Sequence, residues 1–184
     1  MKTVYIITLV LILLAVILAF IILFYKYFNE KLFVLFKKLN DTEEEYLNKF
    51  NKKFEIINSF IDEIVKKYKT ESKTFDSVKK LDDVDISLKT EKLLNKCYKE
   101  LVDIKEDKQK TREVKIFREL IDEFEDNELS LISLRTYYNS YTVIYNNLIS
   151  KFPYNLISKF KKYRVKNLIE GKELEIDFNN DLEV

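Results

Sequence analysis

An apolar run from Val4 to Phe24 constrains this chain more than any other feature, because none of its 21 residues is charged. A helix of that length extends roughly 31 Å, which matches a hydrocarbon core about 30 Å thick. A cleaved signal peptide has a shorter apolar region, about 7 to 15 residues long, that ends at a small-residue cleavage site. Because the run has neither property, we predict an uncleaved transmembrane signal anchor over residues 1–25, with residues 4–24 in contact with the lipid bilayer.

Lysines on the two sides of the run predict its orientation. The run is preceded by Lys2 and followed by Lys26, Lys31, Lys37 and Lys38. Basic residues close to a membrane helix favour the cytoplasmic side. We therefore expect a single-pass protein of the cell membrane, with its N-terminus outside and its C-terminal domain in the cytoplasm. Residues 26–41 would form a juxtamembrane segment between the two.

The composition favours long helices. The 184 residues include one Gly and one Pro, and 34% of them are charged. Strands and hairpins need more turn residues than this. We therefore predict an all-α fold in which the transmembrane helix is followed by an antiparallel helical bundle over residues 42–168. The bundle would contain three long helices and a short C-terminal one.

The longest of these helices should begin near Thr111 and end just before Pro153, because a residue that precedes proline disfavours the α region. Large apolar or aromatic residues recur along it every seven positions, and a second line lies three residues further on. The first line is Phe117, Phe124, Leu131, Tyr138, Tyr145 and Phe152, and the second is Leu120, Leu134, Tyr141 and Leu148. Pro153 can start the short helix, with Leu156, Ile157 and Phe160 pointing the same way.

The first long helix of the bundle is predicted from a capping box formed by Thr42 and Glu45. Its core-facing stripe would be Leu47, Phe50, Phe54, Ile57, Ile61, Ile64 and Tyr68. The sequence is compatible both with a helix continuous with the membrane span and with a hinge near residues 39–42. Another helix is indicated by the spacing of Thr90, Leu94, Cys97, Leu101 and Ile104.

Two stretches lack such periodicity. Residues 69–86 alternate charges with Ser, Thr and Asp, which is typical of a connection of loop and short turns. Residues 169–184 contain six acidic residues and one lysine, and we expect them to form a solvated C-terminal tail.

Several classes of function are disfavoured by what the sequence lacks. It has no His, which removes the commonest acid–base group and zinc ligand, and its single cysteine, Cys97, lies in phase with core positions. It has no phosphate-binding loop and no nucleophile elbow. A net charge of +1 provides no field that attracts nucleic acid. We therefore expect no enzyme activity, no catalytic, cofactor-binding or metal-binding residues, no cofactor and no nucleic-acid partner.

Polar residues interrupt or border the seam of the longest helix. Asn127 lies within it, and Glu128, Arg135 and Thr142 lie one residue further round. Such a polar layer is either a buried binding site or a device that sets helix register and partner choice, and we favour the second interpretation.

Two asparagines, Asn139 and Asn146, each follow a seam tyrosine, Tyr138 or Tyr145, at a spacing of seven. Each amide is placed to bond a neighbouring helix while the tyrosine ring is buried. The pair would form two equivalent polar contacts that lock one helix pairing. The alternative is a binding strip for a partner helix.

These residues belong to a longer pattern that resembles the signature of the LemA family of bacterial membrane proteins. The pattern comprises Arg135, Tyr138, Asn139, Tyr145, Asn146, Ile149, Phe152, Pro153, Asn155, Leu156 and Ile157. Weaker similarity extends to residues 63–68, 127–131 and 175–178. The resemblance implies one N-terminal membrane helix followed by a helical bundle, and no established enzyme activity.

The resemblance has one clear departure. Where the family tends to have a proline in the first helix of the bundle, this chain has Asn58. We therefore expect this helix to be straighter than in relatives.

The function we expect is that of a scaffold or adaptor that contacts other membrane or envelope proteins, with a homo-oligomer as a further possibility. The alternative is a bundle that senses a ligand or ion and signals through its membrane helix, which requires a polar cavity at Glu128 or Arg135.

Overall fold

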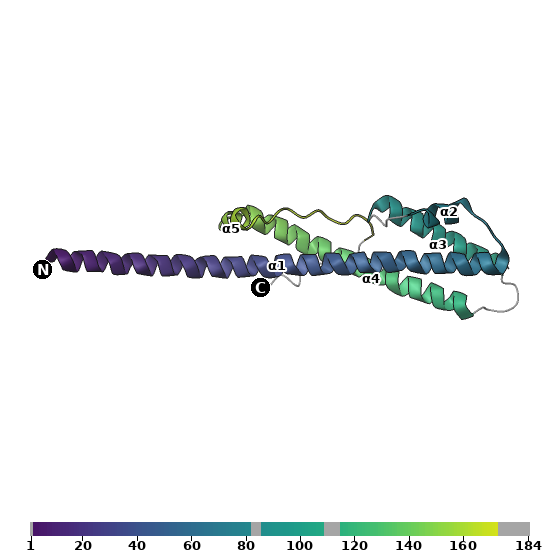
Figure 1. Ribbon diagram of the computed structural model, residues 1–184, viewed down its shortest axis with the longest axis horizontal. Coiled ribbons are helices and arrows are strands. Elements are labelled where there is room, and N and C mark those ends of the chain that lie inside the picture. The colour runs from purple at the N-terminus through teal and green to yellow at the C-terminus, as the bar shows by residue number, and fades with distance from the viewer. Residues whose placement is uncertain (1, 82–85, 109–114, 173–184) are drawn as a thin grey trace. The chain divides into compact units, whose positions relative to one another are not determined.

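The computed structural model describes residues 2–81, 86–108 and 115–172, which form five α helices and no strand (Figure 1). The helices are α1 (Lys2–Tyr68), α2 (Lys73–Lys79), α3 (Leu88–Lys108), α4 (Lys115–Ser150) and α5 (Tyr154–Lys161). The all-α prediction is therefore confirmed. The part of the predicted acidic tail that follows Lys172 lies outside the described residues.

The chain divides into two compact units. The first contains Met1–Asp41 and Ser140–Leu168, and the second contains Thr42–Asn139 and Ile169–Val184. Both α1 and α4 contribute residues to each unit.

Helix α1 contains the apolar run and the first helix of the bundle without interruption. The capping box predicted at Thr42 and Glu45 is therefore wrong, because the backbone amides that a cap would satisfy already bond to the preceding turn. The only Gly and the only Pro of the chain are Gly171 and Pro153, so neither helix breaker falls within α1.

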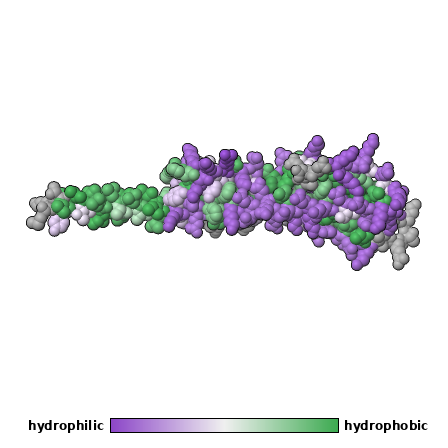
Figure 2. All heavy atoms as spheres, in the orientation of Figure 1, coloured by the Kyte–Doolittle hydropathy of each residue, from purple (hydrophilic) through white to green (hydrophobic). Residues whose placement is uncertain are grey.

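The apolar run of α1 is exposed at every position from Val4 to Phe24. Within the part of the chain that the structure describes, α1 is the one helix long and apolar enough to cross a membrane. Figure 2 shows this stretch as an almost uniformly hydrophobic surface.

The first unit buries side chains from three helices. The buried side chains include Leu32 and Leu39 of α1, Tyr145 and Ile149 of α4, and Ile157 of α5. The short helix predicted after Pro153 is confirmed as α5. However, Leu156 and Phe160 do not share the burial of Ile157, since they are 49% and 82% exposed.

The second unit has a core made by α1, α2, α3 and α4. Its largest members are aromatic: Phe60 of α1 packs on Phe117 of α4 with ring centroids 5.7 Å apart, and Tyr98 of α3 stacks on Phe124 at 3.6 Å. In this unit α1 and α3 run in the same direction, and α4 runs antiparallel to both (Figure 1). The connection between α1 and α3 includes α2 and is long enough to return along the bundle.

The predicted seams are only partly correct. In α1 the buried line contains Tyr46 and Lys53, whereas Leu47 is 39% exposed. In α4 the line from Phe117 to Tyr145 is buried, but Phe152 lies beyond the end of the helix and is 73% exposed. The second line is buried only at its first member, Leu120, whereas the polar residues Arg135 and Thr142 beside it are buried.

Cys97 is fully buried in α3, as the sequence predicts. Burial, assisted by the nearby charge of Glu100, raises the pKa of its thiol to about 12. At pH 8 only about one thiol in ten thousand would then be ionised.

We therefore expect Ellman's reagent to leave Cys97 unmodified in the folded protein at pH 8 and to modify it after unfolding in guanidinium chloride. The control is Ser77→Cys in a Cys97→Ser background, because Ser77 is exposed on α2 and the introduced thiol should react at once. Rapid reaction of Cys97 in the folded protein would contradict its assignment to the core.

Candidate functional site

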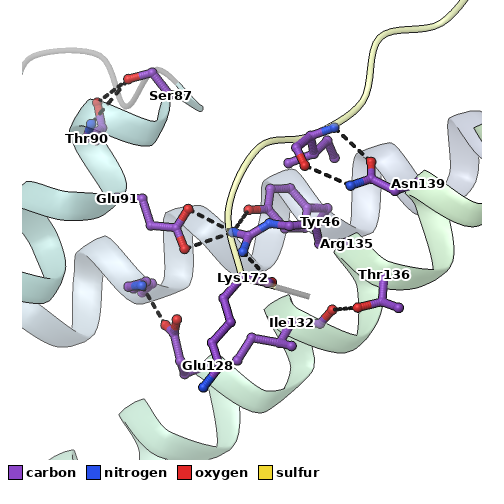
Figure 3. A network of polar contacts seen from close by, with 12 residues as sticks. Tyr46, Ser87, Thr90, Glu91, Glu128, Ile132, Arg135, Thr136, Asn139 and Lys172 are labelled. Carbon is purple, nitrogen blue, oxygen red and sulfur yellow. Dashed lines mark hydrogen bonds and ion pairs between the residues drawn. The ribbon is translucent and has the colours of Figure 1, made fainter. Parts of the chain in front are cut away.

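Arg135 is a buried charged residue of the second unit, and only 1% of its surface is exposed. Its Nη2 donates to the hydroxyl of Tyr46 on α1 at 2.6 Å and to both carboxylate oxygens of Glu91 on α3 at 2.8 Å. Its Nη1 donates to the carbonyl oxygen of Lys172 at 2.7 Å (Figure 3). We call these four residues the Arg135 cluster. One guanidinium thus joins α1, α3, α4 and the chain beyond α5.

The environment fixes the charge state of the cluster. Burial lowers the pKa of Arg135, but hydrogen bonds and charge interactions with Tyr46 and Glu91 outweigh this effect, so that its pKa is raised above the usual value. Burial raises the pKa of Tyr46, and its hydrogen bond with Arg135 offsets only part of that rise. Arg135 therefore stays charged and Tyr46 stays neutral near pH 7, so neither is poised to take up a proton from a substrate.

Gly171 allows the chain to approach Arg135 closely. Its φ of 137° is a conformation that residues with a side chain rarely adopt, and a Cβ atom there would clash with the guanidinium of Arg135. The only glycine of the sequence therefore lies where the backbone must pass the buried charge.

Further contacts of the predicted polar layer join α4 to α1. The ammonium of Lys53, which is fully buried, pairs with Glu128 and lies 5.4 Å from the ring centroid of Phe124. Asn127 donates to the carbonyl oxygen of Lys49 at 3.0 Å. Both Glu128 and Asn127 thus contact α1, as expected of residues that set helix register.

Asn139 bonds to both backbone groups of a single residue, Ile169. Its Nδ2 donates to the Ile169 carbonyl oxygen at 2.8 Å, and the Ile169 amide donates to its Oδ1 at 2.8 Å (Figure 3). We call this arrangement a backbone clasp. It gives Ile169 the two hydrogen bonds that a neighbouring β-strand would otherwise provide.

Asn146 forms an equivalent backbone clasp in the first unit. Its Nδ2 donates to the carbonyl oxygen of Lys166 at 2.8 Å, and the amide of Lys166 donates to its Oδ1 at 3.0 Å. Beside it, the hydroxyl of Tyr145 donates to the carbonyl oxygen of Arg164 at 3.0 Å.

The two clasps have matching spacings in the two segments that they join. Asn139 and Asn146 are seven residues apart, about 10.5 Å along a helix, whereas Lys166 and Ile169 are three residues apart, about 10 Å in an extended chain. The prediction of paired polar contacts is therefore right about their positions but wrong about their partner. They hold an extended C-terminal segment, residues 163–172, and not a neighbouring helix.

The remaining residues of the predicted motif do not form one site. Tyr138 is buried in the second unit, and Tyr145 is buried in the first with its ring centroid 6.0 Å from that of Phe36. Pro153 precedes α5, and the amide of Asn155 bonds to the carbonyl oxygen of Lys151 at 2.9 Å. Phe152 is exposed, as noted above.

Three side chains that pair with Arg135 or Glu128 were not predicted from the sequence: Tyr46, Lys53 and Glu91. A signal for two of them exists, because Tyr46 and Lys53 alternate with Phe50, Ile57, Phe60 and Ile64 in steps of four and three. A search for apolar residues alone does not find this series of positions, because one of its members is a lysine.

An open groove of the second unit is lined by acidic side chains of α4 together with Lys49 and Lys52 of α1. Asn127 of the predicted polar layer borders this groove, whereas Arg135 and Glu128 do not. Among the described residues no group of three or more His, Cys, Asp or Glu side chains is placed to hold a metal ion.

The family comparison matches the region that contains these contacts. The family model for LemA covers residues 42–178, which is more than half of the chain. This protein belongs to the LemA family. The match begins where the second unit begins and includes both the Arg135 cluster and the two backbone clasps. No curated protein and no solved structure matches the chain.

The departure of this LemA-family chain at Asn58 coincides with an uninterrupted stretch of α1. The family match extends to residue 178 and therefore includes residues 175–178, where the sequence resembles the family.

The Arg135 cluster predicts a specific pattern of stabilities. Arg135→Met leaves the Glu91 carboxylate buried without a cation, and we expect it to lower the free energy of unfolding by about 3–5 kcal/mol. Arg135→Met combined with Glu91→Leu should cost less than Arg135→Met alone, because no charge is left unpaired. Urea denaturation of the detergent-solubilised chain measures both.

The matched control is Lys115→Met on the same helix, whose side chain is 90% exposed and should contribute no more than about 0.5 kcal/mol. A double variant whose loss equals the sum of two large single losses would contradict the pairing.

The clasp at Asn139 predicts a pH-dependent variant. Asn139→Asp replaces the donor to the Ile169 carbonyl with a charged oxygen, at a cost of about 1–3 kcal/mol near pH 7. Protonation restores a donor, so the pKa of the introduced carboxyl should be raised in the folded state. The loss should therefore be complete above that pKa and should shrink as the pH falls from about 6 to 4.

Thermal unfolding at pH 7 and pH 4 tests this expectation. Asn147→Asp, at an exposed position on the same helix, is the control for charge. Equal behaviour of the two variants would argue against the clasp.

Proposed function

We propose that this LemA-family protein is a membrane-anchored scaffold or adaptor of the cell envelope, without catalytic activity. The observation that supports this proposal best is that polar side chains of α4 form hydrogen bonds within the chain. Arg135, Asn139 and Asn146 bond to groups of the same chain, so they stabilise the fold and are not presented to a substrate.

The sensing alternative has weaker support. It needs a polar cavity that holds Glu128 or Arg135, yet Glu128 is paired with Lys53, and Arg135 is buried among its partners. The open groove of the second unit is lined by other residues. These contacts favour a structural role for the polar layer.

The partners that we propose are other membrane or envelope proteins, with self-association as a further possibility. Exposed apolar side chains on α4 give such partners a place to bind. They include Leu129, which is 62% exposed, and Val143, which is 57% exposed. Residues 4–24 would keep the chain at the bilayer, where membrane partners are concentrated.

Photo-cross-linking in intact cells tests the scaffold directly. We expect a photoreactive amino acid at Leu129 to join the protein to a defined membrane partner. We also expect Arg135→Ala, which should unfold the second unit, to abolish that product. The same product from the unfolded variant would contradict recognition by a folded bundle.

Ligand-dependent stability separates the scaffold from the sensor. A scaffold should show the same melting temperature with and without Mg²⁺, Ca²⁺ or phosphate, whereas a sensor is stabilised by the species it binds. A reproducible rise in melting temperature with one of these ions would favour the sensor.

We further propose that the bundle lies in the cytoplasm, from the lysines that follow the apolar run. The test is a membrane-impermeant thiol label on Ser77→Cys in a Cys97→Ser background. Labelling only after the membrane is permeabilised would support the proposed orientation, and labelling of intact cells would overturn it.

A further inference from the structure

Helix α5 has an exposed apolar row. The row contains Phe152, which lies before the helix, and Leu156 and Phe160, whose spacing of four residues within the helix places their side chains on one face. Their exposed fractions are 73%, 49% and 82%. The opposite side of α5 buries Ile157 and Ser158 against the first unit. The row is therefore not needed for the core of this unit.

Basic residues surround this apolar row. Residues 151–169 contain no Asp or Glu, and their basic residues are Lys151, Lys159, Lys161, Lys162, Arg164 and Lys166. The whole chain has a net charge of only +1, so positive charge is concentrated in this stretch. Exposed aromatic rings beside several lysines are typical of a surface that binds anionic lipid.

A ring contact places α5 close to the end of the apolar run. Phe28 of α1 packs edge-on against Tyr154 of α5, with ring centroids 5.0 Å apart. Phe28 lies four residues beyond Phe24, or about 6 Å along the helix axis. The headgroup layer on one side of a bilayer is about 5–8 Å thick. If the run spans the membrane, Tyr154 lies at headgroup level.

The direction of α5 agrees with this placement. Figure 1 shows α5 almost end-on while α1 lies along the page, so α5 runs across the direction of α1. A helix across a membrane-spanning helix lies roughly in the plane of the bilayer surface, as interfacial amphipathic helices do. Figure 2 shows hydrophobic atoms at α5, beside the end of the apolar run.

We propose that residues 151–166 form a second membrane contact, which docks on the surface of an anionic phospholipid bilayer. Phe152, Leu156 and Phe160 enter the headgroup region, and the surrounding lysines contact lipid phosphates. The proposal rests on the proposed anchoring of residues 4–24 and adds to it. A transmembrane helix alone leaves the bundle free to tilt, whereas contact through α5 fixes the first unit against the surface.

The absence of tryptophan from the sequence makes the test simple. Phe160→Trp introduces one fluorophore into the full chain, which is reconstituted in vesicles of phosphatidylcholine with phosphatidylglycerol. We expect emission at a shorter wavelength than in detergent-free unfolded protein, and a loss of intensity when the phosphatidylcholine is brominated near the top of its acyl chains. Because both leaflets of the vesicle have the same lipid composition, the result does not depend on the orientation in which the protein inserts.

Two further single-tryptophan variants serve as references. Leu129→Trp, at an exposed apolar position in the second unit, should not be quenched by brominated lipid. Phe20→Trp, within the apolar run, should be quenched whether or not α5 docks. Without quenching at Phe20→Trp, the anchor itself would be refuted and the proposal with it. Quenching at Phe20→Trp combined with a Phe160→Trp signal like that of Leu129→Trp would overturn this proposal alone.

The role of the lysines is tested in the Phe160→Trp background. Lys159→Glu, Lys161→Glu and Lys162→Glu together should reduce the quenching, as should vesicles of phosphatidylcholine alone. Undiminished quenching in both cases would overturn recognition of anionic lipid. A shift to shorter wavelength without quenching by brominated lipid would show that a second copy of the chain covers α5, and would overturn docking on the bilayer.

Discussion

The buried guanidinium of Arg135 determines how the helices of the second unit are arranged. Taking Arg135 out of water is costly unless its charge is paired, and its Nη1 and Nη2 have partners when α1 brings Tyr46, α3 brings Glu91 and the chain beyond α5 brings the carbonyl of Lys172. Apolar packing alone tolerates small rotations and slides of helices. A charge with fixed partners on three segments selects one arrangement among them.

The backbone clasps also use polar side chains of α4, and they hold a segment that has no secondary structure of its own. An extended chain on a helix leaves amide and carbonyl groups that require partners, and an asparagine amide provides one donor and one acceptor at once. Two asparagines seven residues apart match an extended chain at every third residue. The clasps bond to backbone atoms of Lys166 and Ile169, so these hydrogen bonds do not depend on the side chains at the two positions.

Much of this architecture follows from the sequence. The apolar run, the end of α4 before Pro153 and the core position of Cys97 are local consequences of hydropathy, proline sterics and periodicity. The partners of Arg135, Asn139 and Asn146 are not, because they lie 20 to 89 residues away in the chain and several of them are backbone atoms, which every residue has. The seam errors at Leu47 and Phe152 have a geometric cause, since a heptad count assumes a supercoil and an unbroken helix.

Native-state hydrogen exchange of the amides of Lys166 and Ile169 tests most directly whether side chains of α4 hold the extended segment as part of the folded protein. These amides donate to Asn146 and Asn139. If α4 holds the segment, both amides should exchange far more slowly than in an unfolded chain, with opening free energies comparable to those of amides in the middle of α4. Exchange of both amides at the rate of an unfolded chain would show that the segment is a tail, and would contradict its attachment to α4.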